Sequence, residues 1–229
     1  MIGTDGRLKR TVIWQCLPGA TPRVDEQGNI YLAEIVKPAG RSYPAFFDGK
    51  LKPPGKIAKG ASGDRFWTSY VSGSIIKFPP GGGVIGRRVD GRDANYAFGI
   101  PTKVKGALWI HSGASNVPSW RTKGTPDICL CVPMRFDVDE FGRVFYPDAA
   151  RFRAGVLDGN GNVITHFGSY GNQDSAGPGS AVAQPEIAFA WPQVVAADSR
   201  AVYVADQLNR RIVRVKLAYA AEAVCPVSK

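Results

Sequence analysis

One complete structural unit is visible in residues 135–168, which read RFDVDEFGRVFYPDAARFRAGVLDGNGNVITHFG. Apolar and polar residues alternate over four short runs, and turns rich in glycine, asparagine and aspartate separate the runs. Alternation with a period of two is typical of half-buried strands, and turns of this composition join antiparallel neighbours. The stretch therefore predicts a four-stranded antiparallel meander.

The first half of this unit recurs twice. Residues 24–34 align without gaps on residues 138–148, and residues 196–206 align more loosely. Each copy reads as a strand, a tight turn and an alternating strand that ends on a carboxylate. Four-stranded meanders repeated around an axis are the blades of a β-propeller. We therefore expect an all-β fold, a β-propeller.

In two of the copies an arginine follows the terminal carboxylate by five residues, giving the pairs Asp148/Arg153 and Asp206/Arg211. A turn within each pair would bring the acid and the arginine opposite each other on neighbouring strands. Repeated scaffolds repeat their internal braces, whereas active sites are usually singular. We therefore interpret both pairs as structural rather than catalytic.

Residues 191–215 resemble an NHL repeat. A proline precedes the first strand, Val204-Ala205-Asp206 ends the second, and Asn209-Arg210-Arg211-Ile212 opens the third. Residues 135–167 resemble the repeat more loosely, with other residues at the asparagine and isoleucine positions. The resemblance implies a propeller, whose blades in that family commonly number six.

The repeats lie about 57 residues apart, which predicts four to five blades in a single domain over residues 1–229. The clearest blades are residues 131–168 and 187–217. Residues 1–14 read as a turn and a strand. This strand is either the outer strand that closes the last blade or the remnant of a missing blade, in which case the chain is an incomplete or truncated six-bladed propeller.

The chain is basic, with 29 Lys and Arg against 19 Asp and Glu, for a formal net charge of +10. Such a surplus attracts anions such as nucleic acid or acidic polysaccharide, or it only keeps the protein soluble. The candidate ligand-binding residues are cations in a stretch between blades, together with a nearby aromatic residue. They are Arg87, Arg88, Arg92, Lys103, Lys105 and Trp109.

Catalytic signals are weak. His111 and His166 are the two histidines, and the resemblance implies that metal-dependent enzymes of the wider NHL family need several around the central channel. We expect no catalytic residues, no metal and no cofactor. We therefore expect a non-catalytic binding or scaffold module that recognises an acidic glycan, a nucleic acid or a protein partner. The alternative is an extracytoplasmic propeller enzyme, a hydrolase or lyase, with its site at the central channel.

The four cysteines are Cys16, Cys129, Cys131 and Cys225. A disulfide within the C-x-C of Cys129 and Cys131 would be strained, so we expect at least one long-range disulfide and none between these two. Buried thiols or a metal site are the alternatives. Disulfides suit a periplasmic or secreted protein, although residues 1–10 lack the apolar core of a signal peptide. No apolar run is long enough to predict a transmembrane helix.

Overall fold

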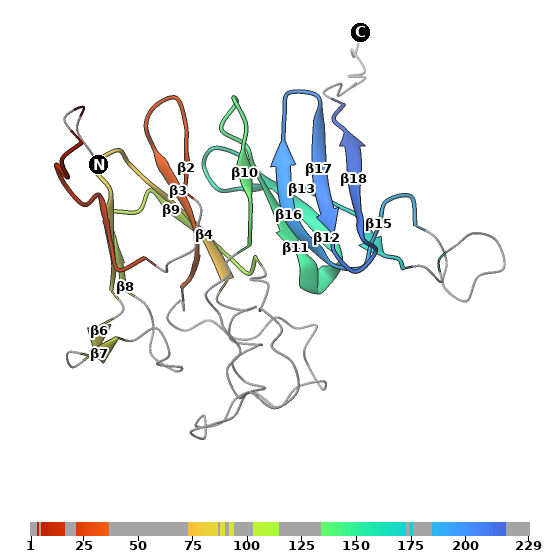
Figure 1. Cartoon of the computed structure of the whole chain (residues 1–229), viewed down its shortest axis with the longest axis horizontal. Coiled ribbons are helices and arrows are strands. Elements are labelled where there is room, and N and C mark those ends of the chain that lie inside the picture. Colours follow the sequence, from red (N-terminus) through yellow and green to blue (C-terminus); the bar gives the residue numbers. More distant parts are fainter. Residues whose placement is uncertain are drawn as a thin grey trace, which may run out of the picture.

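The computed structural model describes residues 4, 6–16, 22–36, 73–86, 88–89, 92–93, 103–114, 134–172, 175 and 185–218, and these form an all-β fold (Figure 1). They contain no α-helix and a single turn of 3-10 helix at Ala149–Arg151. The 27 glycines and 17 prolines of the chain favour short strands and frequent turns over long helices.

Most of the strands belong to four small sheets, numbered here along the chain. The first sheet has the order β1-β5-β8, made of Ile13–Trp14, Gly83–Gly86 and Lys103–Lys105. The second has the order β2-β3-β4-β9, made of Arg23–Val24, Ile30–Ile35, Gly73–Phe78 and Trp109–Ser112. The third has the order β10-β11-β12-β13, made of Asp137–Val138, Val144–Asp148, Arg153–Leu157 and Val163–Phe167.

The fourth sheet has the order β16-β17-β18, made of Pro192–Ala197, Ala201–Asp206 and Arg211–Lys216. Two further pairs are β6 with β7, Arg88–Val89 and Arg92–Asp93, and β14 with β15, Ser169–Tyr170 and Ala188–Phe189. The four-stranded meander predicted for residues 135–168 is confirmed by the third sheet, in which every pairing is antiparallel and joins consecutive strands.

The N-terminal half is less regular than the repeats suggest. β1 pairs in parallel with β5 of the first sheet rather than lying beside β18, so the strand at Ile13–Trp14 does not close the last sheet. β4 and β9 pair with each other in the second sheet, although β5 and β8 lie between them in the sequence. The enlarged loop predicted at residues 41–63 lies outside the described residues.

The aspartate turns share one hydrogen-bonding pattern, seen at Asp25, Asp139 and Asp158. In each, Oδ1 of the aspartate accepts hydrogen bonds from the amides two and four residues later, at 2.8–3.1 Å. The residue three positions later adopts a positive φ, which glycine tolerates at low cost, and the three such residues are Gly28, Gly142 and Gly161. Two of these turns belong to the aligned copies, and the third, at Asp158, joins β12 to β13. The turn of the loosest copy differs, because Asp198 Oδ1 accepts hydrogen bonds from the amides two and three residues later.

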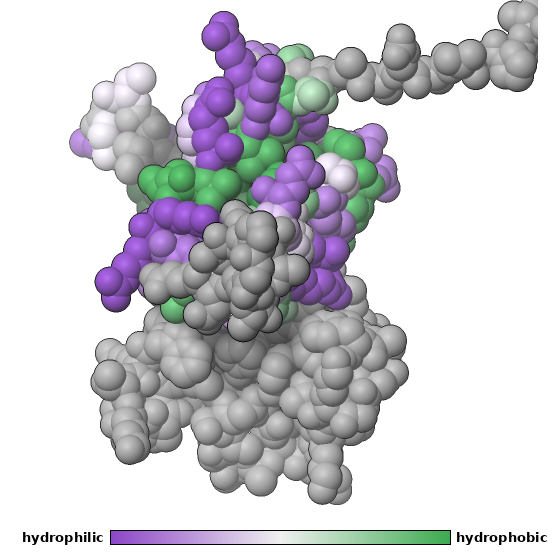
Figure 2. Space-filling model, turned by 90° about the vertical axis from the view of Figure 1, so that its right-hand side faces the viewer, coloured by the Kyte–Doolittle hydropathy of each residue, from purple (hydrophilic) through white to green (hydrophobic). Residues whose placement is uncertain are grey.

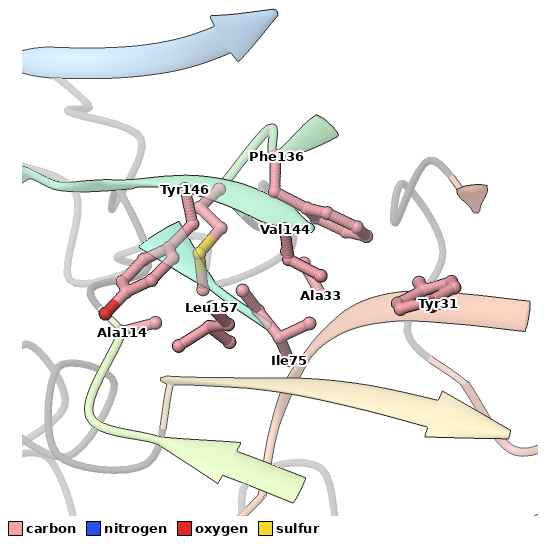
Figure 3. Close-up of a cluster of buried hydrophobic side chains, with 9 residues drawn as sticks. Tyr31, Ala33, Ile75, Ala114, Phe136, Val144, Tyr146 and Leu157 are labelled. Carbon is pink, nitrogen blue, oxygen red and sulfur yellow. The ribbon is translucent and has the colours of Figure 1, made fainter. Parts of the chain in front are cut away.

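Apolar clusters join each sheet to the next along the chain. One packs the first sheet on the second through Ile13, Ile85, Leu32 and Ile76. The cluster in Figure 3 joins the second sheet to the third, with Tyr31 at one end and Tyr146 at the other. A third joins the third sheet to the fourth.

In a strand between two such clusters, alternate side chains therefore pack into different clusters on the two faces of the sheet. On β11, Val144 and Tyr146 face the second sheet, while Phe145 faces the fourth. This explains why β11 is buried along its whole length, whereas the outermost strand β13 is exposed or only partly buried.

The first strands of three successive sheets meet at Asp137. Its Oδ1 accepts a hydrogen bond from Nε of Arg23 on β2 at 2.7 Å, and its Oδ2 accepts one from the amide of Ala197 on β16 at 3.0 Å. Beside it, the carbonyl of Arg135 accepts a hydrogen bond from the amide of Val195. The inner ends of the second, third and fourth sheets are thus held together by polar contacts as well as by apolar packing.

Replacing Asp139 with alanine should lower the free energy of unfolding by about 2 kcal/mol, because two turn amides and the guanidinium of Arg143 lose a nearly buried acceptor. The matched variant Asp139→Asn keeps an oxygen for the amides and should lose less. Urea denaturation of both variants measures the difference. An alanine variant as stable as the wild type would contradict the proposed importance of this turn.

Candidate functional site

The two predicted acid–arginine pairs lie opposite each other on neighbouring strands, as their spacing predicts. Asp148 and Arg153 are register partners on β11 and β12, with 2.9 Å between Oδ2 and Nε. Asp206 and Arg211 are register partners on β17 and β18, with 3.5 Å between Oδ2 and Nε. Both carboxylates are buried, at 1% and 0% exposure of the residue, so the arginines supply ion-pair partners that solvent cannot replace.

Asp206 also fixes the start of its own sheet. Its Oδ1 accepts hydrogen bonds from the amides of Ala190 and Trp191 at 3.0 and 2.8 Å, and its Oδ2 accepts one from Asn209 Nδ2 at 2.6 Å. Arg211 is the fourth partner of this carboxylate. Asp206 therefore connects three segments, which are the residues just before β16, the end of β17 and the turn before β18. Every donor belongs to the scaffold, which supports a structural role for this residue.

Asp148 has a different environment. Its Oδ2 accepts hydrogen bonds from Arg153 and, at 3.3 Å, from Arg151, while its buried Oδ1 has no hydrogen-bond partner among the described residues. The third aligned carboxylate, Glu34 at the end of β3, is fully buried opposite Ser74. A carboxylate at the end of the second strand is therefore common to the second, third and fourth sheets.

The two histidines lie on either side of Tyr146. The Tyr146 hydroxyl and Nε2 of His166 are hydrogen bonded at 3.2 Å, and the ring centroids of His111 and Tyr146 are 5.3 Å apart. Figure 3 shows the hydroxyl at one end of the buried cluster, beside Ala114. A side chain at position 155 would collide with the Tyr146 ring, so Gly155 is required for this packing. The sequence predicted both histidines to be ordinary strand or turn residues, so this cluster was not foreseen.

Partial burial lowers the pKa of His166 below its ordinary value of 6.5. The Arg153 guanidinium lowers this pKa further, and the nearby Asp148 carboxylate opposes the shift. His166 is therefore mostly neutral at pH 7, and a hydrogen bond joins it to the Tyr146 hydroxyl. A tyrosine hydrogen bonded to a neutral histidine is an arrangement that can transfer a proton. Among the described residues, no group of three or more His, Cys, Asp or Glu side chains is placed to hold a metal ion.

The structure separates Trp109 from the basic residues with which it was grouped. Its indole Nε1 donates a hydrogen bond to the carbonyl of Gly159 at 2.9 Å, and its ring packs on the cluster between the second and third sheets. Lys77 contacts the same carbonyl at 3.2 Å and lies 3.4 Å from Oδ2 of Asp25. Trp109 thus helps the second sheet to hold the β12–β13 turn.

The contacts around Asp25 shift the pKa values of two residues. Burial alone would raise the pKa of Asp25, but hydrogen bonds from Asn29 and Tyr31 and the positive charge of Lys77 hold it below its usual range. The pKa of Tyr31 is raised by burial and by its hydrogen bond to the Asp25 carboxylate. Both residues therefore keep their usual charge states at pH 7 and act in packing between sheets.

The predicted cations lie near the first sheet. Lys103 and Lys105 are exposed on β8, and Arg88 and Arg92 belong to the strands β6 and β7 that follow β5. Arg87 lies outside the described residues.

A row of side chains crosses the outward face of the first sheet. The register pairs Trp14 with Val84 and Val84 with Lys105, so the three lie side by side across β1, β5 and β8. Trp14 is 58% exposed and Val84 38% exposed, whereas Ile13 and Ile85 on the other face are buried against the second sheet. Trp14 was missed as a ligand candidate, because only the parallel pairing of β1 with β5 brings it to the lysines.

Cys16 is exposed close to the end of β1. Cys129, Cys131 and Cys225 lie outside the described residues, so the expected disulfide stays a prediction. No helix in the described part of the chain is long and apolar enough to cross a membrane.

Comparisons with known proteins give no family. No protein-family model matches the chain, and no curated protein matches it. Among solved structures, an auxiliary nutrient binding protein from Bacteroides ovatus is similar over 89% of this chain, with 14% sequence identity and a TM-score of 0.25. The chain spans 59% of the length of that protein. A similarity at this TM-score carries no inference about fold or ligand.

Replacing Arg153 with methionine should lower the free energy of unfolding by about 1–3 kcal/mol, because the buried Asp148 loses its shorter ion pair. The matched control is Arg200→Met, since Arg200 is exposed and its loss should change stability by less than about 0.5 kcal/mol. Thermal melting of the two variants tests this. Equal melting temperatures would contradict a structural role for the pair.

The lowered pKa of His166 makes folding sensitive to mild acid. The unfolded chain binds the proton more tightly than the folded state does. The free energy of unfolding should therefore decrease as the pH falls below 6.5, and this decrease should stop once the pH is below the pKa of His166 in the folded state. His166→Gln should remove this component. Urea denaturation of wild type and variant at pH 8 and pH 5 measures the difference, and identical pH dependence would show that His166 does not contribute.

Proposed function

We propose that the chain is a non-catalytic binding or scaffold module built from blades of an NHL-like propeller. Four sheets lie in chain order, each packed face to face on the next (Figure 1), and this arrangement supports the interpretation of the sheets as blades. The first strands of the second, third and fourth sheets contact one another around Asp137, as the inner strands of neighbouring blades do.

The observation that carries the proposal is the exposed row of Trp14, Val84 and Lys105 on the outward face of the first sheet. Lys103 lies on the same face, two residues from Lys105 on β8. An exposed aromatic ring beside two ammonium groups can stack on a base or a sugar ring while the cations pair with phosphate, sulfate or carboxylate groups. We propose an anionic polymer, either an acidic glycan or a nucleic acid, as the ligand of this face.

The repeated carboxylates support a non-catalytic function. Asp25, Asp139 and Asp158 fix turns through their own backbone amides, and Asp206 is surrounded by donors of its own sheet. A carboxylate engaged in this way is poorly placed to act as a general acid or base on a ligand. A periplasmic or secreted location, proposed from the cysteines, favours an acidic glycan over a nucleic acid.

The second candidate function is an extracytoplasmic hydrolase or lyase, and the cluster of His111, Tyr146 and His166 favours it. The Tyr146–His166 hydrogen bond could move a proton, and the buried carboxylate of Asp148 is close enough to influence the pKa of His166. Turnover that disappears in Tyr146→Phe, with folding retained, would support the enzyme.

The binding proposal is tested by measuring affinity for heparin oligosaccharide and for single-stranded RNA over a salt series. Lys103→Ser with Lys105→Ser should weaken binding and reduce the slope of log K against log salt by about one per lysine. Trp14→Ala should weaken binding at every salt concentration and leave the slope unchanged, because stacking releases no counterions. The triple variant Arg87→Ser, Arg88→Ser and Arg92→Ser tests the other predicted cations in the same way.

The control variant is Arg200→Ser with Arg210→Ser, which removes two exposed cations at the turns of the fourth sheet. Equal losses from the lysine and control variants would mean that only the diffuse field of the basic protein acts. Absence of binding at low salt would rule out an anionic ligand.

A further inference from the structure

Among the described residues, the fourth sheet has an open edge. It contains three strands, whereas the second and third sheets contain four, and within the described residues β18 pairs with β17 alone. The amide of Leu217 donates to the carbonyl of Arg200 across this pair. Since a strand residue directs its amide and carbonyl to the same side, Arg211, Val213 and Val215 also bond toward β17. The backbone groups of Ile212, Arg214 and Lys216 therefore face the open side, as a template for another strand.

A groove runs beside this strand. It has a volume of about 450 Å³ and is lined by residues 185–188 on one side and by β18 on the other. Ile187 and Val213 are partly buried against the cluster between the third and fourth sheets, so they give the groove an apolar floor. One end is fixed by Arg211, whose Nη2 donates to the carbonyl of Ala188 at 2.6 Å. The groove is therefore held by contacts within the fold.

The surface around the groove combines apolar and positive groups. Ile212 is 73% exposed, and Arg214 lies over the ring of Tyr203 at 6.0 Å on the same outward face of the sheet. Figure 2 shows this side of the molecule, where hydrophobic surface is exposed between hydrophilic patches. The lining contains three cations, Arg211, Arg214 and Lys216, against one acid, Glu186.

This charge decides between occupants. Two copies of the chain joined through antiparallel β18 strands would place their like charges together, and such pairs are destabilising. An extended acidic segment would instead place carboxylates beside Arg214 and Lys216. Its alternate side chains would lie on the floor made by Ile187, Val213 and Val215, where small apolar residues fit.

We propose that this groove binds an extended segment of a partner protein, with alternating acidic and apolar residues, as a fourth strand on β18. Main-chain hydrogen bonds to Ile212, Arg214 and Lys216 supply affinity, and the alternation of side chains supplies specificity. This inference rests on the proposed binding function. It concerns a different sheet from the row of Trp14, Val84 and Lys105, so the two sites can be tested separately.

The probe is a fluorescein-labelled eight-residue peptide of alternating valine and glutamate, and the readout is fluorescence anisotropy with the full chain. Arg214→Glu with Lys216→Glu should weaken binding by roughly tenfold or more, because both exposed pairs change from attraction to repulsion. The control is Arg7→Glu with Lys9→Glu, which makes the same change in charge at exposed positions before β1 and should alter affinity less than about twofold. Circular dichroism shows that each variant is folded.

A second probe isolates the backbone contacts. Two versions of the same peptide are made, one with N-methyl groups on the odd-numbered residues and one with them on the even-numbered residues. In a strand added to β18, alternate residues face the edge, so only one of the two versions loses the amides that would donate to it. One methylated peptide should therefore bind at least about tenfold more weakly than the other. Three outcomes would each overturn the strand-addition proposal. They are equal binding of the two methylated peptides, equal losses of affinity from the groove and control variants, and no binding of the unmodified peptide. Retained binding of heparin or RNA would then show that the proposed function stands without it.

Discussion

The contact between Asp137 and the strands on either side of it is the constraint on which the arrangement of the sheets depends. One carboxylate accepts a guanidinium from β2 and a backbone amide from β16, so it joins the second, third and fourth sheets where their first strands meet. The apolar clusters supply attraction between the sheet faces, but such packing is not directional. The hydrogen bonds to the two oxygens of Asp137 are directional, so they fix how the first strands of the second, third and fourth sheets lie relative to one another.

The third sheet could be predicted almost completely, because its pairings are local and its turns carry Asp, Gly and Asn at the positions that the turn requires. The spacing of Asp148 from Arg153 and of Asp206 from Arg211 was enough to place both pairs. The first sheet could not be predicted, since the pairing of Ile13 with Gly83 joins segments far apart in the sequence and leaves no periodic signal. For the same reason Trp109 was taken for a surface aromatic residue, whereas its indole contacts a turn of the next sheet.

The distribution of charged residues separates the inside of the fold from its two ends. Carboxylates are concentrated in turns and at strand ends, where backbone amides and arginines engage them. Exposed cations lie on the first and fourth sheets, at β8 and β18, which are the ends of the row of sheets. Positive potential can therefore concentrate at the two ends of the row, because many acids of the described residues bond within the scaffold while the lysines and arginines of β8 and β18 face solvent.

The placement of β5 and β8 between β4 and β9 has a consequence for the order of folding. The third sheet needs only the closure of short loops, so its hairpins can form early and at small entropic cost. The first sheet forms only after the N-terminal strand has found β5, and β9 reaches β4 only across the intervening strands. Amide protons of β11 and β12 should therefore exchange with solvent more slowly than those of β1 and β5, and partial unfolding should begin at the N-terminal end of the row.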